Sequence, residues 1–224
     1  MHTLLTITAV ASLMGSAQLN AELSSSANSE SSAETTTQLM DIERLKVGDT
    51  FADFTIPTPV SPTDSDELQL STMLESGPVV VTFFRGSWCP YCRNELSDIQ
   101  DNIKKFQDLG ATIIAVSPEL PEKSEELNEK LDLGFYVAHD ENNDFARSLG
   151  LTFKLDAKTI KKYREYNINL PKANGTRKWE LPVPATYVIS QDSTVAYVYD
   201  NEDYSKRASH KEILAALLYL QAED

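Results

Sequence analysis

The sequence predicts an α/β domain with a central β-sheet covered by α-helices. Apolar, β-branched runs that suit buried strands alternate along the chain with segments of helical periodicity, and this alternation is typical of layered α/β folds. The chain has 224 residues, 41% of them apolar, which suffices for one ordinary core but would be crowded for two. We expect the folded domain to occupy residues 41–224.

The first forty residues differ in composition from the rest of the chain. An apolar stretch, Leu4–Met14, is followed by small residues and candidate cleavage points after Ala17 and Ala21, so residues 1–21 predict a signal for export to a periplasm or the cell exterior. No Lys or Arg precedes the stretch, and a cytoplasmic location is the alternative. The stretch is shorter and more polar than a typical membrane-spanning helix. The Ser/Thr-rich residues 22–40 predict a disordered tether.

The first half of the domain contains the strongest strand signal. A short alternating pattern over residues 51–56 marks the start of the folded domain. The run Pro78–Phe84 is continuous, β-branched and aromatic, so it predicts a central strand covered on both faces. Apolar residues then recur at helical spacing and predict one helix that ends at Gly110. These residues are Leu96, Ile99, Ile103 and Phe106.

The second half predicts further strands and helices in alternation. Strands over 112–117 and 134–138 flank an acidic helix over 122–131, a β-α-β order that favours parallel pairing. The remaining predicted elements are helices over 142–149, 156–166 and 209–220, and a hairpin of strands over 185–190 and 194–199.

Charge and composition exclude several functions. Acidic residues outnumber basic ones by 34 to 20, and the net charge of −14 repels nucleic acid. The eight glycines form no phosphate-binding or dinucleotide fingerprint, so we expect no cofactor. Two cysteines alone would half-fill a tetrahedral zinc site, so we expect no metal.

Those two cysteines are the candidate catalytic residues. Cys89 and Cys92 lie where the central strand is predicted to become a helix, and the unpaired N–H groups of a helix start stabilise a thiolate there. Cys92 follows by about one helical turn, close enough to form a disulfide. Pro90 suits the first helical turn because it needs no donor. An inert structural disulfide, or two packed thiols, is the alternative.

Neighbouring residues could support the pair. A guanidinium from Arg85 or Arg93 would lower a thiol pKa by favouring the charged form, although either could simply be solvated. Trp88 could face a substrate or belong to the core. Pro184 precedes the predicted strand over 185–190, where an X-Pro bond can be cis.

From about Leu45 to Leu217, the chain resembles the peroxiredoxin-like branch of the alkyl hydroperoxide reductase/thiol-specific antioxidant family. The motifs are LKVGD with ADF over 45–54, FRGSWCPYC over 84–92 and LPVPATYVI over 181–189. The resemblance implies a thioredoxin fold with a mixed sheet, a redox-active Cys89–Cys92 pair, and a cis bond before Pro184 that faces the pair, with Thr186 in the strand that follows.

The family's peroxidatic pattern, Pro-x-x-x-Thr-x-x-Cys with a distant Arg, fits best with Cys92 as the peroxidatic residue. Arg85 then replaces the Pro, Cys89 replaces the Thr, and Pro184 falls near the place of the Arg. These replacements are the residue types that thioredoxins have at the corresponding positions. The resemblance therefore leaves two activities open.

The first activity is a peroxidase that reduces hydroperoxides and is reset by an external dithiol such as thioredoxin. The second is a protein disulfide oxidoreductase in which Cys89 attacks, Cys92 resolves and Pro184 backbone atoms align the incoming disulfide. A third, non-enzymatic hypothesis is a docking module that uses a basic helix, although a solvated helix face explains that helix as well. Its residues are Lys158, Lys161, Lys162 and Arg164. The sequence indicates no oligomeric state.

Overall fold

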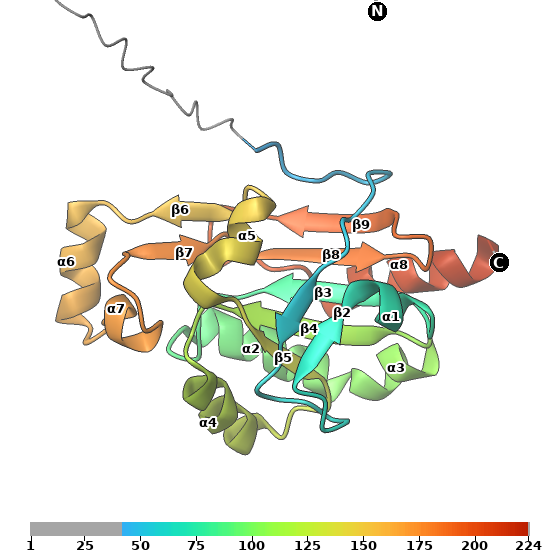
Figure 1. Cartoon of the computed structure of the whole chain (residues 1–224), viewed down its shortest axis with the longest axis horizontal. Helices are drawn as coiled ribbons and strands as arrows, with labels where there is room; N and C mark the ends of the chain where they lie inside the picture. Colours follow the sequence, from blue (N-terminus) through green and yellow to red (C-terminus); the bar gives the residue numbers. More distant parts are fainter. Residues whose placement is uncertain (1–41, 224) are drawn as a thin grey trace, which may run out of the picture. The chain divides into compact units, whose positions relative to one another are not determined.

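The computed structural model describes residues 42–223, which form an α/β fold around a five-stranded sheet (Figure 1). The predicted signal over 1–21 and the tether over 22–40 lie outside the described residues. The strand order in the sheet is β5-β4-β3-β8-β9. The strands are β3 (Val79–Phe83), β4 (Thr112–Ser117), β5 (Tyr136–His139), β8 (Ala185–Ile189) and β9 (Val195–Asp200).

The sheet is mixed, as predicted. β3 pairs in parallel with β4, and β4 pairs in parallel with β5. On its other side β3 pairs antiparallel with β8, which forms an antiparallel hairpin with β9. Parallel neighbours need crossover connections, and helices supply them, as α4 (Pro121–Leu131) does between β4 and β5. The predicted central strand, parallel half and hairpin are confirmed.

The central strand β3 contributes to the cores on both faces of the sheet. All five of its residues are buried, which explains the continuous apolar run. Val79, Val81 and Phe83 pack on one face with α1 (Leu70–Leu74) and α5 (Asp144–Ser148), and Val80 packs on the other. That second face is covered by α2 (Pro90–Asp101) and α8 (His210–Glu223) (Figure 1).

The single helix predicted up to Gly110 is wrong, because the structure divides it into α2 and α3 (Ile103–Asp108). At Asn102 the side-chain amide donates to the Asp98 carbonyl at 2.8 Å, and this is the carbonyl that the Asn102 backbone N–H would use in a continuous helix. That N–H bonds instead to the carbonyls of the previous turn. Apolar periodicity continues through the break, so the pattern could not show it.

Two small sheets and several short helices complete the fold. The remaining elements are β1 (Thr55–Pro57), β2 (Glu67–Gln69), a 3₁₀ turn (Glu141–Asn143), β6 (Thr152–Lys154), α6 (Ala157–Glu165), α7 (Leu170–Ala173) and β7 (Glu180–Pro182). Of these, the sequence did not predict the strand β2 or the strand pair β6–β7, because strands of three residues are too short to show a hydrophobic period. Within residues 42–223, every helix is too short or too polar to cross a membrane.

Candidate redox site

Cys89 lies at the N-terminus of α2, just beyond the C-terminal end of the central strand β3. Its backbone is extended, with φ −87° and ψ 114°, and Pro90 occupies the first helical turn. The Cys89 Sγ accepts a hydrogen bond from the Cys92 backbone N–H at 3.3 Å. A buried strand thus delivers the sulfur to the positive end of a helix, where a thiolate is stabilised.

Arg85 binds the Cys89 sulfur directly. Its side chain is buried, and its Nη2 donates to the Cys89 Sγ at 3.1 Å. Its Nη1 donates to the hydroxyl of Tyr163 on α6 at 2.9 Å. The guanidinium also lies over the Tyr204 ring, 3.9 Å from the centroid. Two aromatic residues from distant segments therefore hold the cation against the thiol.

The two thiols have opposite pKa shifts. The pKa of Cys89 falls to about 5, mainly because the Cys92 side chain hydrogen-bonds to it and because the Arg85 charge favours the thiolate, although burial opposes both effects. Burial raises the pKa of Cys92 well above its usual range, and the neighbouring Cys89 adds to this. At neutral pH the pair therefore holds one thiolate, on Cys89, beside one thiol.

Arg207 is the main functional candidate that sequence reasoning missed. It precedes α8 and donates from Nη2 to the Cys92 Sγ at 3.2 Å. Its Nε lies 2.9 Å from the Oε2 of Glu95, which is buried one turn beyond Cys92 on α2. Burial raises the pKa of Glu95 to about 8, against the opposing charge of Arg207. Each cysteine thus has its own arginine.

The other sequence-predicted residues lie around this centre. Trp88 packs edge-on against Tyr163, with the centroids 5.6 Å apart. Thr186 shares a 2.9 Å hydroxyl contact with Thr82 across the paired strands β8 and β3. Pro184 is buried, and its carbonyl accepts a hydrogen bond from the Asn201 N–H at 3.2 Å. The cis bond stays a prediction.

Arg93 does not take the electrostatic role that its position suggested. Its side chain is exposed and donates from Nη1 to the Ser87 carbonyl at 2.8 Å. No contact joins it to either sulfur, and its charge is not among the main causes of the Cys89 pKa shift. Because successive residues of a helix point in different directions, Arg93 leaves the pair and braces the preceding turn.

Glu119, which sequence reasoning also missed, fixes the turn before Cys89. It is buried after β4, and its carboxylate accepts from the Ser87 backbone N–H at 2.6 Å and from the Ser87 hydroxyl at 3.0 Å. Within the same turn Gly86 has φ +144°, and a Cβ there would lie 2.5 Å from the Trp88 Nε1. Only glycine allows that approach.

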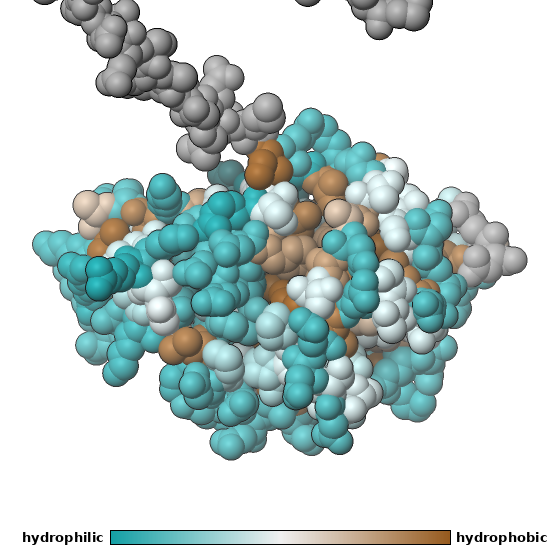
Figure 2. All heavy atoms as spheres, in the orientation of Figure 1, coloured by the Kyte–Doolittle hydropathy of each residue, from teal (hydrophilic) through white to brown (hydrophobic). Residues whose placement is uncertain are grey.

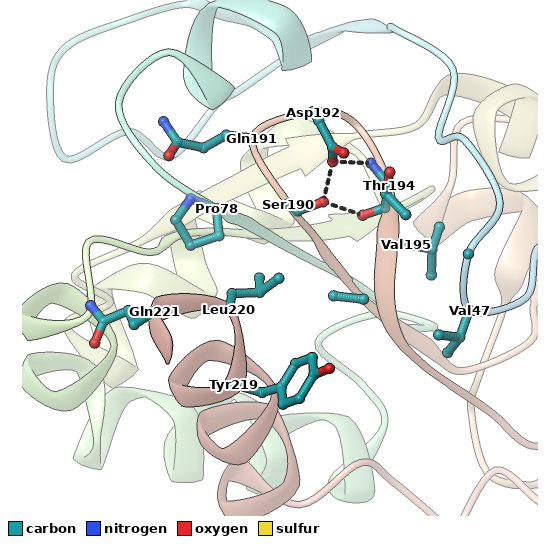
Figure 3. Close-up of a pocket in the computed structure, with 12 residues that line it drawn as sticks. Val47, Pro78, Ser190, Gln191, Asp192, Thr194, Val195, Tyr219, Leu220 and Gln221 are labelled. Carbon is teal, nitrogen blue, oxygen red and sulfur yellow. Dashed lines mark hydrogen bonds between the residues drawn. The ribbon is translucent and has the colours of Figure 1, made fainter. Parts of the chain in front are cut away.

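Two cavities lie near opposite ends of β3. One of about 600 Å³ borders the redox turn and is lined by Ser87, Trp88 and Glu119 together with residues of α4 and α7. Another of about 470 Å³ lies by Pro78, before β3 begins, where Asp192 accepts from Ser190 and Thr194 in the hairpin turn (Figure 3). That second cavity contains no cysteine and lies away from the redox chemistry.

No cluster of three or more histidine, cysteine or acidic residues in the described range could hold a metal. The reactive groups that the structure shows at the site are the Cys89 and Cys92 thiols, with Arg85 and Arg207 beside them. A low-pKa thiol at the start of the helix that follows the central strand, with a second thiol one turn later, defines a dithiol oxidoreductase site on a thioredoxin fold.

The chain belongs to the AhpC/TSA family, which matches residues 47–198. It is 26% identical over 148 residues to a chloroplastic peroxiredoxin Q of Gentiana triflora, covering 66% of this chain and 58% of that protein. It is 31% identical over 105 residues to the thiol-disulfide oxidoreductase ResA of Oceanobacillus iheyensis, covering 46% and 54%. The chain spans about half the length of the curated relatives it matches.

The solved structures support the same fold. Peroxidoxin BcpB of Mycobacterium tuberculosis superposes with a TM-score of 0.61 at 24% identity, covering 79% of this chain and 99% of that one. The family resemblance and the thioredoxin fold predicted from the sequence motifs are therefore confirmed.

Proposed function

We propose that this protein is a thiol-dependent peroxidase in which Cys89 attacks the hydroperoxide and Cys92 resolves the product. The observation that carries the proposal is the Cys89 sulfur, which has a pKa of about 5 and accepts a hydrogen bond from the buried Arg85 at 3.1 Å. Similarity to peroxiredoxin Q supports the substrate class. The register of the family motif would favour Cys92 as the attacking residue, but its raised pKa leaves it protonated.

In the first step, the Cys89 thiolate attacks the distal oxygen of the hydroperoxide and the O–O bond breaks. Cys89 becomes a sulfenic acid, and the departing alkoxide takes a proton to leave as an alcohol. Arg85 can stabilise the charge that moves onto the oxygens, because its guanidinium already lies against the attacking sulfur. Arg85 thereby supplies a cation in a chain that has Pro184 near the place of the family's distant Arg.

In the second step, the Cys92 sulfur attacks the sulfenic sulfur, a disulfide forms and water leaves. Cys92 must lose its proton to attack, and the Arg207 cation at 3.2 Å favours the resulting thiolate. An external dithiol of the thioredoxin type then reduces the disulfide and is itself oxidised.

A protein disulfide oxidoreductase is the second candidate. The 31% identity to ResA favours it, as does the position of Cys89 at the helix start with Cys92 one turn later. Here Cys89 attacks a disulfide of the substrate, and Cys92 then attacks the mixed disulfide and releases the reduced substrate.

We also propose export through residues 1–21, supported by the apolar stretch Leu4–Met14. N-terminal sequencing of the protein isolated from cells tests for cleavage.

Rapid mixing of the reduced protein with hydrogen peroxide or with a disulfide peptide distinguishes the two activities. Fluorescence of Trp88, next to Cys89 in the chain, would report oxidation. The peroxidase proposal predicts fast, stoichiometric oxidation by peroxide that Cys89→Ser abolishes, while Cys92→Ser retains the first phase. Oxidation by peroxide no faster than that of a free thiol, with rapid reaction of the disulfide peptide, would establish the second candidate instead.

A further inference from the structure

A basic lobe projects beside the redox site of this acidic protein. We define it as residues 152–182, which comprise β6, α6, α7 and β7 and form the end of the molecule in yellow and orange in Figure 1. The lobe contains eight basic and three acidic residues, although the whole chain has a net charge of −14. Its basic residues are Lys154, Lys158, Lys161, Lys162, Arg164, Lys172, Arg177 and Lys178.

The cations of the basic lobe are exposed and form no salt bridge with the described residues. All eight side chains are exposed, and within residues 42–223 none has a carboxylate oxygen within 4 Å. Some lysines outside the lobe do form salt bridges, as Lys104 does with Asp108 and Lys123 with Glu126. Figure 2 shows mostly hydrophilic residues over this end of the molecule. Uncompensated charge of one sign creates a local field that attracts anionic surfaces.

The basic lobe contacts the redox site through α6. Tyr163 accepts the hydrogen bond from Arg85, which binds the Cys89 sulfur. The Tyr163 ring also packs against Trp88 in the turn before Cys89. On the same helix, Arg164 lies over the Trp179 ring of the lobe at 5.2 Å from the centroid, which restrains its charge. A macromolecule bound on α6 would therefore lie close to the reactive sulfur.

We propose that the basic lobe is the docking surface for an acidic dithiol protein that reduces the oxidised Cys89–Cys92 pair. This inference rests on the proposed function, because it requires that the cycle leaves a disulfide. One thiolate of the partner attacks a sulfur of that disulfide, which gives a mixed disulfide and releases one thiol of this chain. The second partner thiol then displaces the other. Two electrons and two protons pass to the chain, and the partner becomes a disulfide.

Charge favours a protein over a membrane as the occupant. The positive charges spread over both helices and β6 of the lobe, and α6 has no buried residue, so the surface suits a broad contact. The rest of the chain is strongly acidic and would oppose adsorption to an extended anionic bilayer. A compact acidic protein would be repelled from the other faces and oriented toward the lobe, with its thiols near Cys89.

The test compares three reductants. Two are dithiol peptides that share a Cys-Gly-Pro-Cys core, one flanked by glutamates and the other by lysines, and the third is neutral dithiothreitol. Each reduces the pre-oxidised full chain, and tryptophan fluorescence follows the rate. The matched variants are Lys158→Gln/Lys161→Gln/Lys162→Gln on α6 and Lys104→Gln/Lys105→Gln/Lys211→Gln on α3 and α8. Both sets remove three exposed lysines.

We expect the acidic peptide to reduce the native chain at least about tenfold faster than the basic peptide at low salt, with the advantage lost at high salt. The α6 variant should lose most of this advantage, whereas the control variant retains it and dithiothreitol acts equally on all three proteins. An α6 variant with the native ratio of peptide rates would overturn the proposal. So would anionic vesicles that bind the native chain and not the α6 variant.

Dithiothreitol also separates the failure of this proposal from the failure of the proposed function. If dithiothreitol recovers two thiols per oxidised chain while the acidic peptide shows no advantage, only the docking surface is wrong. If peroxide leaves no disulfide for dithiothreitol to reduce, the redox cycle itself is wrong and the docking proposal falls with it.

Discussion

Replacing Arg85 by Gln should raise the pKa of Cys89 and slow its reaction with hydrogen peroxide most strongly at acidic pH. The native guanidinium donates to the Cys89 Sγ at 3.1 Å from a buried position, so solvent screens little of its charge. Removing an adjacent opposite charge shifts a pKa by about one to three units, and we expect a rise of about two. Gln keeps a donor of similar size but no charge.

The decrease in the rate of reaction with peroxide depends on pH, and this dependence shows whether the raised pKa of Cys89 is its cause. With a pKa of about 5, Cys89 is mostly thiolate at pH 6. With a pKa of about 7 only about a tenth would be thiolate at pH 6, so the rate there should fall by about tenfold. At pH 8 both proteins are almost fully ionised, and any difference that remains reports the loss of charge stabilisation on the peroxide oxygens.

Thiolate ultraviolet absorbance, titrated against pH, gives the pKa, and stopped-flow fluorescence gives the rates. Arg93→Gln is the matched control, because Arg93 also flanks the pair but is exposed and bonds to the Ser87 carbonyl. It should leave the midpoint near its native value. An unchanged midpoint in Arg85→Gln, or an equal shift in both variants, would refute the reasoning.

Three further predictions concern the surroundings of the pair. Arg207→Gln should slow disulfide formation after peroxide addition by about tenfold, because Cys92 loses the cation that favours its thiolate. Counting the free thiols by quenched flow measures this rate, and an unchanged rate would contradict the prediction. Gly86→Ala should reduce the free energy of unfolding in urea by roughly 2 kcal/mol, because a Cβ would meet the Trp88 Nε1 and strain a φ of +144°, and native stability would contradict this. The pKa of Glu95 in the folded protein is about 8, above its ordinary value of 4.5. The free energy of unfolding of the native protein, relative to that of Glu95→Gln, should therefore be greatest at acidic pH. It should fall by on the order of a few kcal/mol as the pH rises through the interval between these two pKa values. Parallel stability profiles of the two proteins would argue against a protonated Glu95.

The part of the site that could be predicted from the sequence is the part that one continuous segment supplies. The apolar run of β3, the two cysteines and Pro90 follow one another within fifteen residues, so strand, turn and helix start could be predicted from local pattern. Arg85 belongs to the same segment, and sequence reasoning included it on the basis of proximity alone.

The residues that reach the site from distant segments had no local signal. Arg207 is 115 positions from Cys92, and Tyr163 is 78 positions from Arg85. Each occupies an ordinary polar stretch, and only the packing of α6 and of the segment before α8 against the redox turn brings them together. Glu119 was missed for the same reason, because the burial of a carboxylate depends on the tertiary structure.

Proximity in sequence could not distinguish the role of Arg93 from that of Arg85. Arg85 and Arg93 both flank the pair, but Arg85 precedes the helix and Arg93 lies on its exposed side. The helix rotation sets the direction of a side chain, and Asn102 shows the related difficulty at the end of α2, where a side-chain hydrogen bond interrupts an unbroken apolar pattern.

The most direct test of the account locates the first oxidised sulfur. The Cys92→Ser variant, reduced and mixed with one equivalent of hydrogen peroxide, should accumulate a sulfenic acid that dimedone traps and mass spectrometry assigns to Cys89. Cys89→Ser, treated in the same way, should remain unlabelled, because burial keeps the pKa of Cys92 high. Rapid labelling of Cys92 in the Cys89→Ser variant, with none on Cys89 in the other, would contradict the central claim.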